Sequence, residues 1–316
     1  SRTKGATLGG EIVKDYIKKY RQSPSLSIAK IMVKEHPETY HSIEQARAIV
    51  RYYRGSSGER SRAKLPDARI VDWQPCVVTE SPAIVAADMH IPYHDNDAID
   101  IMLDRLAAMG AKALILDGDV MDMYQASSFS RDPSQMSLAD EVDLVCDFIQ
   151  GIQHDFPQVK IYYKLGNHEK RWESMLRLKI PELVGFEFTS AKKLLETRLP
   201  GVIVINHTTP ITYGKLTIIH GHEYGGGSGM PVNPARLMFL KAKKSVLCGH
   251  YHQKSEHQEP TISGDTVGAW SIGCMCDLHP EYAPLNKWSM GFAELSLDEY
   301  GNFQVRNRSI IDYQLR

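Results

Sequence analysis

The chain has 316 residues, of which 42% are hydrophobic and 24% are charged, and its formal net charge is −1. This length allows one large domain or two unequal ones, while the longest apolar runs are far too short to span a bilayer. No apolar secretory leader is visible, and five scattered cysteines favour free thiols in a reducing compartment, so we expect a cytoplasmic protein without a membrane partner.

Charge is distributed unevenly along the chain. Residues 1–72 carry 15 Lys and Arg against 8 Asp and Glu, a balance of +7, whereas the remainder balances at −8. The chain thus has a basic head, residues 1–72, and an acidic body, residues 73–316. This division indicates two units with different partners.

Residues 1–55 predict a small domain of three helices. "GEIVKDYIKKYRQ" places its apolar residues on one helical face, and "SLSIAKIMVKEH" should end before Pro37. "SIEQARAIVRYYRG" begins at Ser42, with Gln45 at the spacing of a capping box. Residues 56–74 are expected to form a linker, because "GSSGERSRAK" from Gly55 to Lys64 is charged and rich in Gly and Ser.

The last predicted helix of the head carries Arg47, Arg51 and Arg54 on its outward side. Three short helices with a basic last one resemble a helix-turn-helix, so these arginines are candidate nucleic-acid contacts. A helical bundle used for oligomer contacts remains the alternative.

Residues 75–316 predict an α/β body with mixed sheets, because strands and helices alternate. Strands are expected at "AIVAAD", "KALILDGD", "KIYYKLGN", "VIVI", "SVLCG" and "TVGAWSIG", and helices at "NDAIDIMLDRLAAMG", "SLADEVDLVCDFIQGI", "EKRWESMLRLK" and "PARLMFLKAKK". "ITYGKLTIIHG" resembles a hairpin, and "GFAELSLDEYGNFQVRNRS" resembles closing antiparallel strands.

Polar residues follow five of these apolar runs directly. The five blocks are "ADMH" (Asp88, His90), "DGDVMD" (Asp119, Asp122), "LGNHE" (Asn167, His168), "IIHGHE" (His220, His222) and "LCGHYH" (His250, His252). Open α/β sheets place their sites at the carboxyl ends of the strands, so we expect these side chains to converge. Carboxylate, amide oxygen and imidazole without thiolate suit Mn, Fe, Zn, Co or Ni.

Two cysteines stand apart from those blocks. Cys274-Met-Cys276 has the composition of half a zinc site, but the chain offers no second pair to complete it. Buried apolar thiols are the favoured interpretation. The segment from Cys274 to Trp288 is expected either to line the site or to form a partner surface.

The order D-x-H, G-D-x-x-D, G-N-H-E, H, G-H-x-H resembles the calcineurin-like metallophosphoesterase superfamily. The resemblance implies a four-layer α/β-β/α sandwich that binds two divalent ions, with Mn favoured. It assigns Asp88, His90 and His252 to the first ion, Asn167, His220 and His250 to the second, and Asp119 to both.

The resemblance also implies that His168 passes a proton to the leaving group, with Asp122 orienting it. A helix N-cap is the alternative role of Asp122. Asn167, His222, Arg171 and Tyr93 are candidate substrate contacts. Glu169 is expected only to favour the start of the helix that follows it.

Three functions are compatible with these features. The leading hypothesis is a phosphodiesterase or nuclease whose basic head grips DNA. The second is a phosphatase or diesterase acting on nucleotides, other small molecules or phosphoproteins, although "GDVMDMY" lacks the Arg-Gly of the protein-phosphatase branch. The third is a non-enzymatic DNA-binding or assembly protein. The sequence leaves the oligomeric state open.

Overall fold

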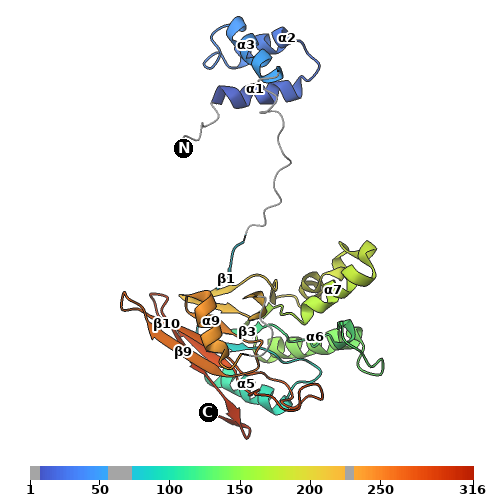
Figure 1. The fold of residues 1–316 in the computed structure, drawn as a ribbon, viewed down its shortest axis with the longest axis vertical. Helices are drawn as coiled ribbons and strands as arrows, with labels where there is room; N and C mark the ends of the chain where they lie inside the picture. The colour runs from blue at the N-terminus through green and yellow to red at the C-terminus, as the bar shows by residue number, and fades with distance from the viewer. Residues whose placement is uncertain (1–7, 56–72, 225–230) are drawn as a thin grey trace. The chain divides into compact units, whose positions relative to one another are not determined.

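The computed structural model describes residues 8–55, 73–224 and 231–316, which fall into two compact units, Ser1–Asp72 and Trp73–Arg316 (Figure 1). The predicted linker, residues 56–74, lies outside the described residues except for its last two. Among the helices of the described residues, none is both long and apolar enough to cross a bilayer.

Three helices make up the described part of the first unit: α1 (Leu8–Lys19), α2 (Ser25–Glu35) and α3 (Ile43–Arg54). They enclose a small core of buried apolar side chains that includes Val13, Ile28, Met32 and Val50. The hydroxyl of Ser42 caps α3 by accepting the Gln45 N–H at 3.1 Å. The Gln45 side chain accepts from the N–H of His41 instead of that of Ser42, so the reciprocal bond falls one residue early.

The three arginines of α3 lie in different surroundings. The Arg54 guanidinium donates to the carbonyl oxygens of Ser23 at 2.6 Å and Tyr20 at 3.0 Å, which fastens α3 to the connection between α1 and α2. Arg51 is exposed, and Arg47 is half-buried beside Glu44. Arg54 therefore serves the packing of the head, while nucleic-acid contacts of Arg47 and Arg51 stay a prediction.

One six-stranded sheet of the second unit has the order β12-β11-β2-β3-β4-β5. Its strands are β2 (Ala83–Ala86), β3 (Ala113–Asp117), β4 (Lys160–Lys164), β5 (Ile203–Ile205), β11 (Ala293–Leu297) and β12 (Phe303–Asn307). β2 to β5 are parallel, while β11 and β12 extend the sheet antiparallel beyond β2.

The other six-stranded sheet has the order β1-β6-β7-β8-β10-β9. Its strands are β1 (Cys76–Val78), β6 (Ile211–Tyr213), β7 (Leu216–Ile219), β8 (Val246–Cys248), β9 (Ser255–Pro260) and β10 (Thr266–Ser271). β6 and β7 form the predicted hairpin, and β7, β8 and β10 are parallel neighbours.

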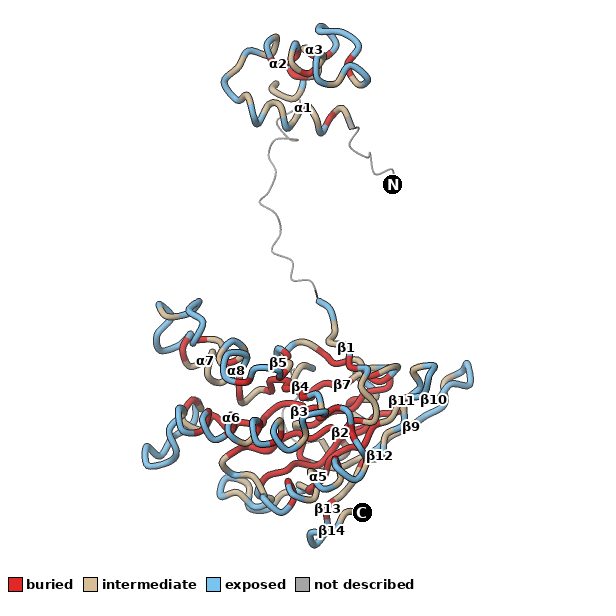
Figure 2. The backbone as a smooth tube through the Cα atoms, turned by 180° about the vertical axis from the view of Figure 1, so that it is seen from behind, coloured by how far each residue is buried: buried red, intermediate tan, exposed pale blue. Residues whose placement is uncertain are grey.

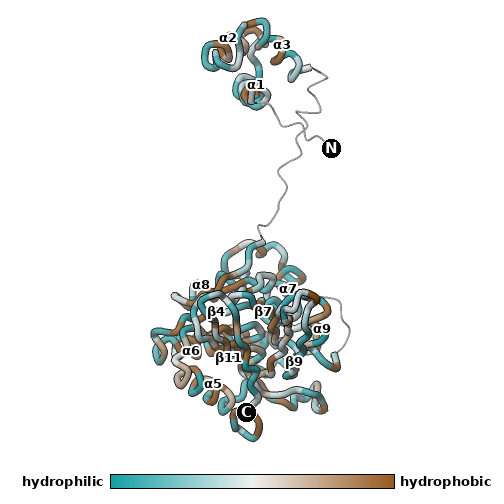
Figure 3. The backbone as a smooth tube through the Cα atoms, turned by 90° about the vertical axis from the view of Figure 1, so that its left-hand side faces the viewer, coloured by the Kyte–Doolittle hydropathy of each residue, from teal (hydrophilic) through white to brown (hydrophobic). Residues whose placement is uncertain are grey.

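The two sheets face each other across a shared apolar core. Alternation along β2 sends Ala83 and Val85 into the core between the sheets, and Ile84 and Ala86 into the core beneath the helices. Figure 2 shows the buried strands at the centre of this unit, and Figure 3 shows hydrophobic stretches along them. Each fully buried Val, Leu or Ile side chain stabilises the fold by about 1.5–3 kcal/mol.

Helices cover the outer faces of both sheets and complete four layers. α5 (Asn96–Ala108), α6 (Leu138–Asp155) and α8 (Ala191–Arg198) pack on the sheet that contains β2, and α9 (Pro234–Ala242) packs on the other sheet. The α/β-β/α sandwich expected from the sequence is confirmed.

The remaining elements are short or lie at the edges. They are α7 (Glu169–Lys179), the 3₁₀ turns η2 (Tyr124–Ala126), η3 (Pro181–Leu183), η4 (Glu187–Thr189) and η5 (His222–Tyr224), and the hairpin of β13 (Ile310–Ile311) with β14 (Gln314–Leu315). The sequence pattern did not predict β9, because its "SEHQEP" residues are mostly polar and exposed on an edge strand.

Candidate metal centre

All five polar blocks follow parallel strands at their carboxyl ends. Three come after β2, β3 and β4 in one sheet, and two come after β7 and β8 in the other. Because the two sheets face each other, these ends meet at one edge of the sandwich.

The first cluster contains Asp88, His90, Asp119 and His252. Donor atoms of Asp88, His90 and Asp119 lie within 4.8 Å of one another. The Nε2 atoms of His90 and His252 are 3.1 Å apart, and Asp88 Oδ1 lies 3.3 Å from His252 Nε2. Ligands about 2.0–2.1 Å from a tetrahedral ion lie roughly 3.4 Å apart, so this spacing suits donors around one ion.

The second cluster contains Asp119, His220 and His250, whose donor atoms also lie within 4.8 Å of one another. His220 Nε2 is 3.2 Å from Asp119 Oδ2. Asn167 Oδ1 is buried and has no hydrogen-bond partner among the described residues. Asp119 belongs to both clusters, as expected of a carboxylate that bridges two ions.

Hydrogen bonds orient two of these imidazoles for metal binding. His90 Nδ1 lies 3.0 Å from Asp122 Oδ1, and His220 Nδ1 lies 2.6 Å from the carbonyl oxygen of Asp117. Each Nδ1–H donates to its oxygen, which leaves Nε2 with a free lone pair directed at the cluster. His220 Nε2 and Asp88 Oδ1 are buried without a hydrogen-bond partner among the described residues, as a metal site requires.

The backbone around the clusters is unusual. Positive φ values occur at five of the seven predicted ligands, namely Asp88, His90, Asp119, His250 and His252. Such conformations cost about 1–3 kcal/mol each in ordinary residues and concentrate at functional sites. At Gly166 an added Cβ would lie 2.1 Å from Asp119 Oδ1, so only glycine lets the loop after β4 approach this carboxylate.

His168 lies beside the clusters but makes a different set of contacts. Its Nδ1 is 2.8 Å from the carbonyl oxygen of Asp122 and 3.2 Å from Asp122 Oδ1. Its Nε2 is 2.8 Å from one guanidinium nitrogen of Arg171. The other terminal nitrogen of this guanidinium donates to the Asp122 carbonyl at 2.9 Å. Asp122 thus contacts both His168 and His90. It does not cap the nearby 3₁₀ turn η2, whose N-cap is Met123.

Glu169 has a larger role than the predicted one. It is fully buried, and its carboxylate accepts hydrogen bonds from five donors: the N–H groups of Asp119, Val120, Met121 and Gly166 and the Tyr163 hydroxyl. Burial and the Asp119 carboxylate raise the pKa of Glu169, and the backbone N–H groups act against that rise. Glu169 therefore holds the loop of the bridging carboxylate. Its position at the start of α7 gave no sign of this, since an acid there also favours a helix.

The segment from Cys274 to Trp288, whose place was left open, lines the first cluster. The Trp288 ring centroid lies 4.2 Å from that of His252. The Cys276 thiol lies within 4.8 Å of donor atoms of His90 and His252. Sequence reasoning missed this contact, although "GCMC" follows the parallel strand β10, much as the five blocks follow their strands.

No protein-family model matches the sequence, and no curated protein matches it. Vacuolar protein sorting 29 from Cryptosporidium parvum is similar in structure, with a TM-score of 0.42 and 12% identity, over 76% of this chain and 96% of that chain. Pseudomonas putida nuclease MPE has a TM-score of 0.34 and 12% identity, over 67% and 84% of the two chains. The phosphoesterase YfcE from E. coli has a TM-score of 0.34 and 16% identity, over 69% and 88%. Identities this low concern the fold alone.

The layers of the sandwich and the order of the five blocks agree with the expectation from the sequence. The chain has the four-layer α/β-β/α fold that the sequence resemblance implied. Its donor set of carboxylates, imidazoles and one amide fits two divalent ions.

Charge at the clusters favours cation binding. Burial opposes ionisation of Asp119, but His220 and His168 outweigh it and hold the pKa of Asp119 well below its usual range. Burial and the neighbouring His220 lower the pKa of His250 to about 4, which keeps its imidazole neutral. Ionised carboxylates and neutral imidazoles are the forms that bind metals. Burial opposes protonation of His220 and His252, but the Asp88 and Asp119 carboxylates raise the pKa of both, so each must release a proton when an ion binds.

The predicted substrate contacts Tyr93 and His222 lie near the clusters. The Tyr93 hydroxyl donates to Gln135 Oε1 at 3.3 Å, and the ring is 39% exposed. The His222 ring centroid is 5.3 Å from that of His220, next to the second cluster. Both side chains border the site, while their contacts with a substrate remain a prediction.

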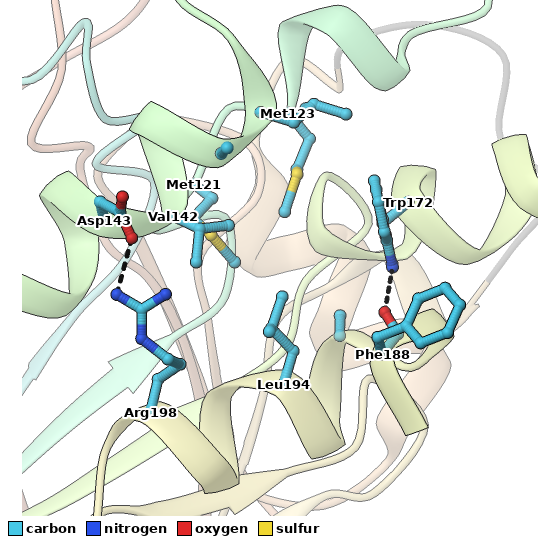
Figure 4. A pocket seen from close by; sticks show the side chains of 11 residues that line it. Met121, Met123, Val142, Asp143, Trp172, Phe188, Leu194 and Arg198 are labelled. Carbon is cyan, nitrogen blue, oxygen red and sulfur yellow. Dashed lines mark hydrogen bonds and ion pairs between the residues drawn. The ribbon is translucent and has the colours of Figure 1, made fainter. Parts of the chain in front are cut away.

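An apolar pocket of about 430 Å³ lies behind the loop of Asp122 (Figure 4). Met121 and Met123 line it from that loop, and helices α6, α7 and α8 supply most of the rest. The Trp172 indole N–H donates to the Phe188 carbonyl at 3.2 Å at one side of this pocket.

Proposed function

We propose that this protein is a two-metal phosphoesterase that hydrolyses phosphodiesters, with DNA as the leading substrate. The observation that carries the proposal is the pair of clusters that share Asp119. Two bound divalent ions would supply an activated water and neutralise charge on the phosphoryl oxygens. The cluster residues would hold these ions, and the buried carboxylates would balance their charge.

His168 and Arg171 provide the remaining chemistry. Because His168 Nδ1 is held on the Asp122 carbonyl, Nε2 is the atom that passes a proton to the leaving oxygen. Arg171 contacts this nitrogen and can instead donate to a phosphate oxygen, which would release Nε2. Burial opposes protonation of His168, but the carboxylates of Asp119 and Asp122 outweigh it and raise its pKa.

Hydrolysis of bis-p-nitrophenyl phosphate in the presence of Mn²⁺, Zn²⁺ or Co²⁺ tests the proposal. The intact protein should hydrolyse this diester. His252→Ala should abolish hydrolysis, because it removes one of the predicted ligands of the first ion. His257→Ala removes a half-buried histidine of β9 that pairs with Glu259, so it is the matched control and should leave hydrolysis unchanged. Absence of metal-dependent hydrolysis of any diester or monoester would refute the proposal.

DNA is favoured as substrate because the first 72 residues are strongly basic. A full chain with Arg47→Gln and Arg51→Gln should bind DNA more weakly. The slope of log affinity against log salt should fall by about 2, or about 1 for each lost phosphate contact. An unchanged slope would favour the small-molecule alternative.

A further inference from the structure

Cys276 lies in the loop that follows the parallel strand β10. Its side chain follows β10 in the segment that also carries Cys274, and it is only 3% exposed. The Cys276 sulfur, a nitrogen of His90 and a nitrogen of His252 all lie within 4.8 Å of one another. The thiol is therefore grouped with two of the donors of the first cluster.

Backbone hydrogen bonds hold Cys276 in this position. The Met275 N–H donates to the Asp88 carbonyl at 3.1 Å, and the Met275 carbonyl accepts the Asp95 N–H at 3.0 Å. One residue further on, the Asp277 N–H donates to the Tyr93 carbonyl at 2.9 Å. These bonds join the segment on both sides of Cys276 to the loop that carries His90, so the thiol and the imidazole are positioned together.

A carboxylate oxygen of Asp88 lies beside the same two imidazoles. Asp88 is fully buried, and its Oδ1 has no hydrogen-bond partner among the described residues although it lies 3.3 Å from His252 Nε2. An unpartnered buried carboxylate oxygen is costly unless a cation binds it. The sulfur of Cys276 thus stands beside two imidazoles and a carboxylate that are arranged as ligands.

The other thiol of the pair contacts Cys276 but lies outside the donor groups. Cys274 Sγ lies 3.7 Å from the Ser289 carbonyl oxygen and belongs to none of the donor groups of the described residues. The two cysteines are both buried, which makes Cys274 a matched control for Cys276.

We propose that Cys276 supplies a thiolate ligand to the first metal ion, beside Asp88, His90 and His252. The proposal rests on the metal site of the proposed function and not on the hydrolysis. On binding, the thiol releases its proton to solvent and a sulfur–metal bond replaces the S–H bond, with no change of oxidation state. A thiolate favours Zn²⁺, Co²⁺ or Fe²⁺ over Mn²⁺ and Mg²⁺, which prefer oxygen ligands.

Cobalt substitution tests the proposal, because thiolate coordination gives Co²⁺ a near-ultraviolet charge-transfer band that imidazole and carboxylate do not. The Co²⁺-loaded full chain and its Cys274→Ser variant should show this band. Cys276→Ser should lack it while keeping the visible bands of cobalt bound by the other ligands. Zn²⁺ affinity should fall by about tenfold or more in Cys276→Ser, and Mn²⁺ affinity should change far less.

A measurement on the unaltered protein covers the case in which Cys276→Ser fails to fold. X-ray absorption at the zinc edge should find one sulfur at about 2.3 Å for every two zinc ions, among nitrogen and oxygen ligands. A zinc site without sulfur, or a cobalt band that persists in Cys276→Ser, would overturn the proposal. Diester hydrolysis by the same preparations separates the two proposals, since an active enzyme without the sulfur signal refutes only the thiolate ligand.

Discussion

Replacing Glu169 by glutamine tests whether its carboxylate supports the metal centre. The two oxygens share five donors: Val120 N–H at 2.8 Å, Met121 N–H at 3.1 Å and Tyr163 hydroxyl at 3.0 Å on Oε1, and Gly166 N–H at 2.7 Å and Asp119 N–H at 3.1 Å on Oε2. A glutamine keeps the most hydrogen bonds when its amide oxygen takes the place of Oε1, which has three donors. Its NH₂ group then faces the two N–H groups that Oε2 accepted. Two hydrogen bonds to a charged acceptor are lost, each worth about 1.5–3 kcal/mol. Glu169→Gln should therefore lower the free energy of unfolding by about 3–6 kcal/mol.

Urea unfolding of the metal-free protein measures this loss, and calorimetric titration with Zn²⁺ or Mn²⁺ measures its effect on the site. Metal affinity should fall as well, because the loop of Asp119 loses part of its support. Glu173→Gln on the same helix is the control, since its exposed ion pair with Arg177 at 3.6 Å contributes only about 0.3–0.5 kcal/mol. A loss below about 1 kcal/mol for Glu169→Gln, with metal affinity unchanged, would refute the reasoning.

Three further predictions concern buried or catalytic groups. Burial raises the pKa of Glu141 from 4.5 to about 7. The folded state thus keeps a proton that the unfolded chain loses, and stability falls as pH rises from about 4.5 to 7. In the unaltered protein this group should lower the free energy of unfolding by roughly 3 kcal/mol between about pH 5 and pH 8, and Glu141→Gln should abolish that decrease. Urea unfolding at several pH values measures it, and a pH profile that the substitution leaves unchanged would contradict the prediction. Lys164 is fully buried and pairs with Glu223 at 2.8 Å, so Lys164→Met should cost about 3–5 kcal/mol on thermal or urea unfolding. Adding Glu223→Gln to Lys164→Met should recover part of the lost stability. If the losses of the two single variants simply add in the double variant, the ion pair does not contribute as proposed. His168→Ala should slow diester hydrolysis by about 10²–10⁴-fold with both metals retained on elemental analysis, whereas loss of a metal would show that His168 is a ligand.

Much of the candidate site could be predicted because strand ends are encoded locally. Apolar runs such as "ALILD" predict buried strands, and the polar residues that follow them must emerge at one edge of a parallel sheet. This reasoning identified Asp88, His90, Asp119 and His220, and the structure brings these residues together. The head was equally accessible, since its helices carry clear amphipathic faces and a serine cap at Ser42.

What the sequence by itself determined is therefore the order of elements, the layer class and the residues that leave the strand ends. Only the tertiary structure decided the contacts that cross between segments. Glu169 was interpreted as a helix-favouring charge because its five donors come mainly from the loop after β3, far along the chain. Cys276 was interpreted as a buried apolar thiol because its neighbours His90 and His252 lie in loops that follow strands of different sheets. Arg54 was placed on an outward face, yet carbonyl groups of the α1–α2 connection bind it. In each case the residue type was visible, but its partner depended on how separate loops pack against one another.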